Sequence, residues 1–304
     1  MDLEALRAER LRAHRLSAPA ASVVEAARHM TATQAQEFWG GRWALAVRAE
    51  GDPTLAEVDA AFDRGALVRS WTQRGTVHII ESRDLEWMLS VTSDRQNRHA
   101  AGMHRSLALD DDHLARAEGV ARAALAGGNR LTRAEFADIL AAAGIDPSGM
   151  RGNHVLTALC RRAVCVFGPV VPREGAPTRE QYVVATEEWI TDAVRPPDPL
   201  AEFFVRYLRG HGPARLEDFR WWAGVPLGLA RDTRAGAGDR VEEIEEGLFV
   251  ESGGVSSGPV EPGSALTGVL ALGPFDEYYL SYADRTVPAS PDVVRFVGRA
   301  RTGP

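Results

Sequence analysis

The chain has 304 residues and a formal net charge of −7, so it fits two or three compact units, and any binding of a polyanion must rest on local basic patches. No run reaches the roughly 18 apolar residues of a membrane helix, and the charged N-terminus lacks the apolar core of a signal peptide. We therefore expect a cytoplasmic protein without membrane contact. The two cysteines, Cys160 and Cys165, have the spacing of neither a zinc site nor an iron–sulfur cluster, and we expect no metal and no cofactor.

The first part of the chain has the order of helices followed by a β-hairpin. A helix is predicted from about Gln34 to Ala49, and a capping box at Thr54 begins another. Residues 66–80 then alternate as two strands around a turn at Arg74-Gly75. This order predicts a winged helix over residues 1–81.

The same order returns twice. After a helical linker over residues 82–126, a second winged helix is predicted over residues 127–186 and a third over residues 187–252. The phrases LTRAEFADIL and ARLEDFRWWA align at Leu, Glu and Phe, which favours true repetition over a set of unrelated α+β domains. Residues 253–304 are predicted to form a C-terminal β segment, beginning with the apolar run GVLALG, and a tail.

The most unusual local sequence is Gln34-Ala35-Gln36, two amides on either side of a small residue at a predicted helix start. A neutral amide is a poor base, but it can hold and polarise a water by accepting and donating hydrogen bonds together. That suits a reaction whose leaving group is already activated, such as an alkylated purine that carries a positive charge. The alternative is a pair of ordinary surface residues at the start of a helix.

The first hairpin is the second candidate. Arg74 at its tip can contact a phosphate, and we expect Arg69 from the same hairpin to do so as well. Arg42 and His78 are expected near the glutamine pair. His78 alternates with apolar neighbours, so the competing interpretation is a histidine that faces solvent.

A third group lies near the C-terminus, where Asp276, Glu277, Asp284 and Arg285 stand among tyrosines. Adjacent carboxylates can do acid–base work or bind a cation, but more often they are hydrogen-bonded structural groups. No phosphate-cradling loop and no serine or cysteine nucleophile motif is present in the sequence.

Four stretches together resemble the winged-helix DNA glycosylase family of AlkZ and YcaQ: the Gln34–Gln36 motif, the TQRGTVH hairpin, GPARLEDFRWW and FDEYYLSYADR. The likeness runs from about residue 17 to 288. It implies an α+β fold of three tandem winged helices that form a C-shaped cleft for duplex DNA. It also implies monofunctional hydrolysis of N-alkylated purines, in some members the unhooking of interstrand crosslinks, and a water-positioning role for Gln34 and Gln36.

The chain contains no lysine, so no side-chain amine can form a Schiff base, which agrees with a glycosylase that lacks a lyase step. We expect a monomer that binds double-stranded DNA and associates with the nucleoid when bound. Two alternatives stay open: a non-enzymatic winged-helix protein such as a transcription regulator, and a protein that only binds lesions. A regulator has no reason to keep the glutamine pair.

Overall fold

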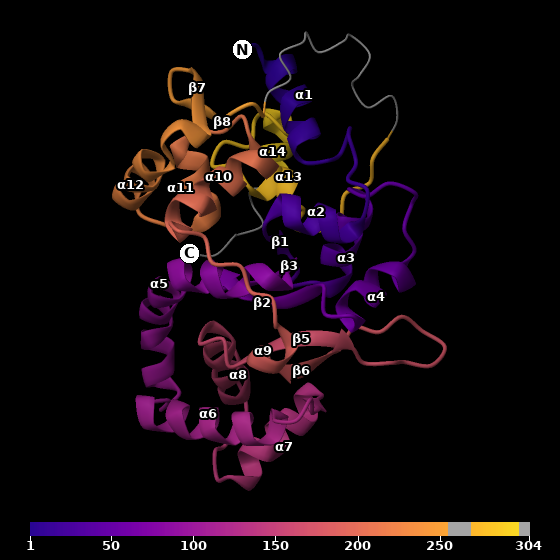
Figure 1. Ribbon diagram of the computed structural model, residues 1–304, viewed down its shortest axis with the longest axis vertical. Coiled ribbons are helices and arrows are strands. Elements are labelled where there is room, and N and C mark those ends of the chain that lie inside the picture. Colours follow the sequence, from indigo (N-terminus) through magenta and orange to yellow (C-terminus); the bar gives the residue numbers. More distant parts are fainter. Residues whose placement is uncertain (255–268, 298–304) are drawn as a thin grey trace. The chain divides into compact units, whose positions relative to one another are not determined.

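The structure, a computed structural model, describes residues 1–254 and 269–297, and the chain divides into two compact units (Figure 1). The first, here called the hairpin unit, comprises residues 34–42 and 53–199. The second, here called the aromatic unit, comprises residues 1–33, 43–52 and those from 200 onward. Each unit is described by itself.

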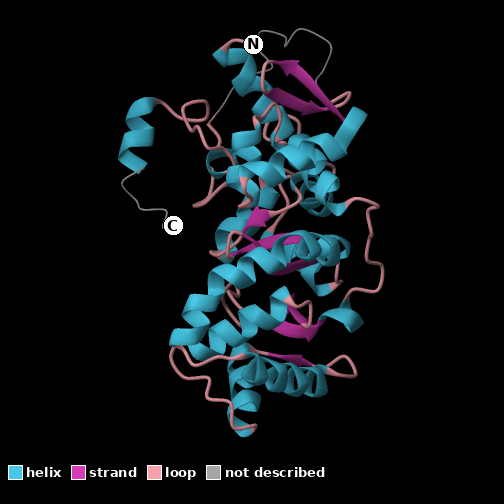
Figure 2. Cartoon of the chain, turned by 90° about the vertical axis from the view of Figure 1, so that its left-hand side faces the viewer, coloured by secondary structure: helices cyan, strands magenta, loops and turns pink. Residues whose placement is uncertain are grey.

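The hairpin unit combines helices with two β-hairpins (Figure 2). Its helices are α4 (Leu55–Asp63), α5 (Leu85–Ser106), α6 (Asp111–Leu125), α7 (Arg133–Ala142), α8 (Arg151–Arg161) and the short α9 (Thr186–Trp189), with a 3-10 turn η1 (Ser82–Asp84) before α5. Its strands are β1 (Thr33–Gln34), β2 (Leu67–Gln73), β3 (Thr76–Glu81), β4 (Arg130–Leu131), β5 (Cys165–Val170) and β6 (Gln181–Ala185). Helix α3 (Phe38–Ala46) begins in this unit.

The two predicted wings of this unit join in one sheet. The strand order is β1-β3-β2-β5-β6-β4, and Arg69 of β2 pairs with Phe167 of β5. One hydrophobic core runs beneath both hairpins, and it includes Trp71 and Val77 from the first together with Phe167 and Val183 from the second. The first hairpin is therefore braced by the second, which makes it a firm platform for a site. The division of the chain into three separate winged helices stays a prediction.

Local sequence signals explain where the helices of this unit begin. Thr54 and Thr132 each accept a hydrogen bond from the backbone three residues on, and Glu57 and Glu135 close the two capping boxes. The box at Thr54 confirms the helix start predicted there. The helix predicted from about Gln34 begins only at Phe38, because Thr33 and Gln34 pair with the sheet as β1.

The aromatic unit contains α1 (Leu3–Ala13), α2 (Val23–Met30), α10 (Pro199–His211), α11 (Leu216–Ala223), α12 (Leu227–Ala237) and a hairpin of β7 (Val241–Glu245) and β8 (Leu248–Glu251). A 3-10 turn, η2 (Gly238–Arg240), precedes β7. Rings from α10 and α11 fill its core, with Phe203 and Trp222 at 5.1 Å and Phe204 and Phe219 at 4.9 Å between ring centroids. Such aromatic pairs bury large area and prefer tilted contacts of this kind. The hairpin predicted after residue 240 is confirmed.

The predicted C-terminal β segment over residues 253–304 is wrong where the structure describes it. Residues 269–297 contain the helices α13 (Glu277–Leu280) and α14 (Pro291–Val297) and no strand. The described part of the apolar run that was expected to be a strand pairs with no strand, since the β7–β8 sheet is two-stranded. Asp276 instead caps α13 by accepting a hydrogen bond from the backbone N–H of Tyr278 at 2.8 Å. Within the described residues no helix is long and apolar enough to cross a membrane.

Candidate active site

The glutamine pair lies where β1 ends and the chain turns into α3. Ala35 is 1% exposed, and its N–H donates to the carbonyl oxygen of Val77 on β3 at 2.8 Å. Gln34 is half-buried and Gln36 is exposed, in the bend before Phe38. The two amides therefore stand on either side of a residue that the sheet holds in place.

A glycine in α3 explains why the middle residue of the motif is small. A Cβ atom at Gly41 would lie 2.5 Å from the Cβ of Ala35 and 2.9 Å from Cδ1 of Ile79. Distances under 3 Å are not tolerated between carbon atoms, so α3 approaches the strand end only because residue 41 has no side chain. Gly41, Ala35 and Ile79 thus form one close-packed contact that fixes the backbone of the motif.

The pleat of the sheet places Gln34 on the same face as His78. Ala35 and Ile79 share the face that packs beneath Gly41, and successive side chains of a strand point to opposite faces. Gln34 and His78 are therefore on the other face. Ser70 pairs with His78 across the hairpin, and both are fully buried. The expected position of His78 near the motif fits this geometry, but the competing interpretation of a histidine that faces solvent is wrong.

The tip of the first hairpin is the predicted two-residue turn. Arg74 and Gly75 have φ angles of 52° and 71°, and positive values at both positions are typical of a type I′ turn. Gln96 of α5 supports the tip, since its Oε1 accepts a hydrogen bond from the Gly75 N–H at 3.1 Å. Arg74 is half-buried at this turn. A side chain on so well supported a turn can be presented to a ligand at low entropic cost.

Arg42 and Arg69 are packed inside the unit. Arg42 is 1% exposed, its Nη1 lies 2.7 Å from the Asp59 carboxylate, and its Nη2 donates to the Thr178 carbonyl at 2.8 Å. Arg69 is 8% exposed and lies over the ring of Phe38 at 4.5 Å. These positions do not fit the expected contact of either arginine with a DNA phosphate. Sequence could not show this, because the burial comes from partners far along the chain.

The electrostatics of this pair follow from burial. Burial, helped by neighbouring guanidinium groups including that of Arg42, lowers the pKa of Arg69 to about 9, so Arg69 still carries its charge at neutral pH. Burial also raises the pKa of the Asp59 carboxyl, and the hydrogen bond from Arg42 opposes that rise. Both guanidinium groups lie over the ring of Phe38, with Cζ of Arg42 at 4.1 Å and Cζ of Arg69 at 4.5 Å from the ring centroid. The arginines anchor the first turn of α3.

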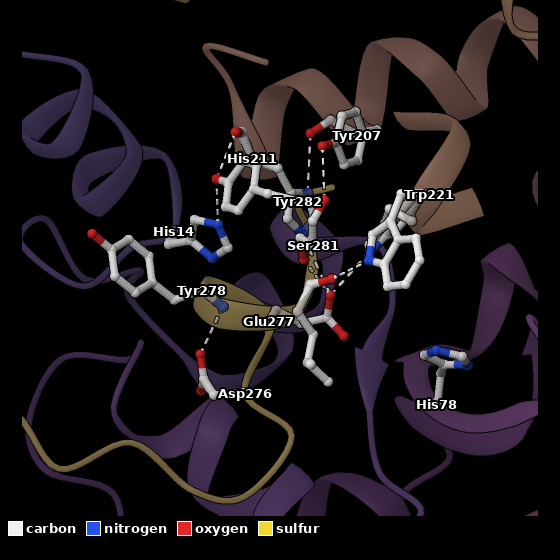
Figure 3. A network of polar contacts seen from close by, with 12 residues as sticks. His14, His78, Tyr207, His211, Trp221, Asp276, Glu277, Tyr278, Ser281 and Tyr282 are labelled. Atoms are coloured by element: carbon white, nitrogen blue, oxygen red, sulfur yellow. Dashed lines mark hydrogen bonds and ion pairs between the residues drawn. The ribbon is translucent and has the colours of Figure 1, made fainter. Parts of the chain in front are cut away.

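The C-terminal carboxylates form a structural network in the aromatic unit (Figure 3). Asp276 binds Arg48 through two hydrogen bonds of 2.7 and 2.9 Å. Glu277 is fully buried and accepts from Nε1 of Trp222 at 2.9 Å and from the Ser281 hydroxyl at 2.6 Å. These contacts favour a structural role for the two carboxylates over a role in acid–base catalysis. Among the described residues, no group of three His, Cys, Asp or Glu side chains could hold a metal ion.

Sequence reasoning missed two residues of this unit, one beside the motif and one beneath the hairpin tip. Trp39 follows the pair by three residues and is 39% exposed, unusual for so large an apolar side chain. Gln96 supports the hairpin tip from α5, and no local pattern marks it. The Gly40-Gly41 pair, by contrast, is visible in the sequence, and glycine within a helix is a recognised sign of a close backbone approach.

Helices followed by antiparallel hairpins define a mixed α+β protein, and its fold is that of a known winged-helix structure. The chain is similar to the solved Streptomyces sahachiroi DNA glycosylase AlkZ, with a TM-score of 0.76 and 22% identity, over 99% of this chain and 83% of that one. The sequence model of the AlkZ-like DNA glycosylases matches residues 27–295. The chain therefore belongs to the AlkZ-like DNA glycosylase family. No curated protein matches it significantly.

Proposed function

We propose that this protein hydrolyses the N-glycosidic bond of N7- or N3-alkylated, cationic purines in double-stranded DNA. Membership of the AlkZ-like family supports a glycosylase that acts on DNA. The observation that carries the proposal is the geometry of the glutamine motif. Ala35 is buried and hydrogen-bonded to β3, while Gln34 and Gln36 on either side of it remain at least partly accessible.

The proposed chemistry needs little from the protein. Alkylation makes the purine a cationic leaving group, so the C1′–N bond breaks with its electron pair going to the base, which becomes neutral. Water adds its oxygen to C1′ and releases a proton to solvent. The amide oxygens of Gln34 and Gln36 accept hydrogen bonds from that water and direct its lone pair at C1′. Holding the water in line supplies rate through orientation rather than basicity.

DNA binding must come from local features, because the whole chain carries a net charge of −7. Arg74 stands at the tip of the supported hairpin and is the arginine of the first wing that we propose as a phosphate contact. Trp39 is exposed close to the motif and can stack on a base or sugar. His78, on the same face as Gln34, is proposed to help hold the amide in position.

The proposal also covers the reaction type, the assembly state and a second candidate substrate. The chain has no lysine, so we propose a monofunctional glycosylase without lyase activity. We also propose that it acts as a cytoplasmic monomer that associates with the nucleoid when bound to DNA. Interstrand crosslinks through alkylated purines present the same cationic leaving group and are a second candidate substrate.

The experiment measures release of 7-methylguanine from methylated duplex DNA. We expect release by the wild type and loss of release in a Gln34→Ala, Gln36→Ala double variant that keeps its circular dichroism and its unfolding midpoint. A control is Gln73→Ala, which removes an amide from β2 of the same sheet, outside the motif. Release of 7-methylguanine by the double variant at the wild-type rate would refute the proposed role of the motif.

A wild type that binds DNA but releases no 7-methylguanine would be tested next on crosslinked duplex DNA. Release from that substrate would restrict the activity to crosslinks or bulky adducts. No release from either substrate would favour the alternative, a winged-helix protein that binds DNA or lesions without catalysis.

A further inference from the structure

A cavity of about 280 Å³ lies within the aromatic unit, apart from the glutamine motif. It is bounded by the end of α1, by α2, by α10 and by β8, which are labelled in Figure 1. Its apolar lining comes from Ala13, Leu208, Pro213 and Val250, and its charged lining from Glu9, Arg12, Arg15, Arg209 and Glu251. The size is at the lower end for small-molecule sites.

Two of the three guanidinium groups are neutralised by carboxylates. Arg209 binds Glu251 through Nη2 at 2.6 Å and through Nε at 2.9 Å. Arg12 donates through both Nε and Nη2 to the carboxylate of Glu9, which is 5% exposed. These pairs leave the cavity with one net positive charge, and that charge belongs to Arg15.

Within the part of the chain that the structure describes, Arg15 forms hydrogen bonds with neutral groups, the Ala18 carbonyl and the His29 ring. The His29 Nε2 lies 2.7 Å from the Ala13 carbonyl oxygen, so Nε2 must carry the proton and donate it. Nδ1 of the neutral ring is then an acceptor, and Arg15 Nη2 donates to it at 3.4 Å. Burial, followed by the charge of Arg15, lowers the pKa of His29 to about 4, which agrees with a neutral ring. The buried Nε of Arg15 has no hydrogen-bond partner among the described residues.

The backbone of Arg15 is held in a conformation that favours glycine. Its φ is 57°, and it follows the end of α1, where Arg15 N–H donates to the Arg12 carbonyl and Leu16 N–H to the Leu11 carbonyl, both at 2.9 Å. This pair of hydrogen bonds is the Schellman motif, whose left-handed position is most often glycine. An arginine at this position costs conformational energy, and residues held in such strained backbone conformations are concentrated at functional sites.

We propose that this cavity binds a phosphate group, with Arg15 as the cation that receives it. Arg15 offers a charged donor that no carboxylate in residues 1–254 or 269–297 satisfies, and guanidinium–phosphate pairs are strong and directional. The apolar lining accommodates a sugar or base beside the phosphate. The cavity is too small for a passing duplex, so the ligand is either a free mononucleotide or the phosphorylated end of a DNA strand.

The test uses the full-length chain and the variant Arg15→Gly. Glycine removes the guanidinium and also suits the left-handed backbone, so this variant is expected to fold with equal or greater stability. Calorimetry would compare deoxyguanosine 5′-monophosphate with deoxyguanosine, and a 5′-phosphorylated oligonucleotide with its 5′-hydroxyl form. The matched control is Arg231→Ala, which removes an exposed arginine from α12 of the same unit.

We expect the phosphorylated ligand to bind wild type and Arg231→Ala equally, and Arg15→Gly about tenfold or more weakly. Binding of the mononucleotide would assign a free nucleotide, and binding of only the phosphorylated oligonucleotide would assign a DNA end. Equal affinity for phosphorylated and unphosphorylated ligands, no binding by wild type, or an unchanged affinity in Arg15→Gly would overturn the proposal. This result is independent of the glutamine motif, since neither ligand needs a glycosidic bond to be cut.

Discussion

The substitution Gly41→Ala tests whether the glutamine motif is held by the contact between α3 and the sheet. The new Cβ would lie 2.5 Å from the Ala35 Cβ, whereas carbon atoms in contact prefer about 3.5–4.0 Å. The helix and Ala35 must therefore separate by about 1 Å or more. A displacement of that size in a positioning element costs about 100-fold in rate. Overpacking costs about 1–3 kcal/mol, partly offset by about 1 kcal/mol from replacing glycine in a helix.

The assay is the initial rate of 7-methylguanine release, measured with the free energy of unfolding in urea. The matched control is Gly119→Ala in α6, where a Cβ would meet nothing within 4 Å. We expect Gly119→Ala to keep the wild-type rate and gain up to about 1 kcal/mol of stability. A Gly41→Ala protein that releases 7-methylguanine at nearly the wild-type rate would refute the argument that this contact positions the motif.

Three further predictions concern the two units. Asp59→Ala leaves the buried charge of Arg42 without its carboxylate. The free energy of unfolding measured in urea should therefore fall by about 3–5 kcal/mol, and a fall below about 1 kcal/mol would contradict the importance of this ion pair. Gln96→Ala removes the hydrogen bond that supports the hairpin tip. This variant should bind DNA more weakly in an anisotropy titration and lose only about 1 kcal/mol of folding stability, and an unchanged affinity for DNA would contradict a role for the tip. Burial lowers the pKa of three histidines in the aromatic unit, which must stay neutral when folded: His14, His29 and His211. Because the unfolded chain takes up these protons as pH falls below about 6.5, each of the three histidines should make stability drop below that pH. For His29, whose folded pKa is about 4, the drop should reach about 1.4 kcal/mol per pH unit between pH 6.5 and 4, and a pH dependence that is the same in wild type and His29→Gln would contradict this.

Local signals in the sequence were enough to mark the starts of α4 and α7 and to predict all three hairpins. Thr54 and Thr132 with their glutamates mark helices by hydrogen bonds that span only three residues, and Arg74-Gly75 marks a turn by its own backbone preference. The early start predicted for α3 failed for a non-local reason. Residues 33 and 34 are paired with a sheet whose next strand along the chain, β2, begins only at Leu67.

The arginines show why site residues are harder to predict than elements. Arg42, Arg69 and Arg74 look alike in the sequence, yet only Arg74 stays at a turn with partial exposure. Arg42 is buried because a loop from beyond residue 170 supplies the Thr178 carbonyl. A side chain of this length is amphipathic, so its stem packs on apolar surface and its head finds whatever partner the fold brings near. Charge type alone therefore cannot separate a DNA contact from a structural ion pair.

The glutamine pair differs from these arginines because its geometry depends on its immediate neighbours. Ala35 must be small to accept the close approach of Gly41, and both residues are visible within one eight-residue stretch. A surface pair without function would place no such demand on the helix that follows, since glycine in a helix costs about 1 kcal/mol relative to alanine. The destabilising Gly41 thus stands at a position where a methyl group would move the motif. That coincidence argues for a positioned pair of amides over an incidental one, and the Gly41→Ala rate measures it directly.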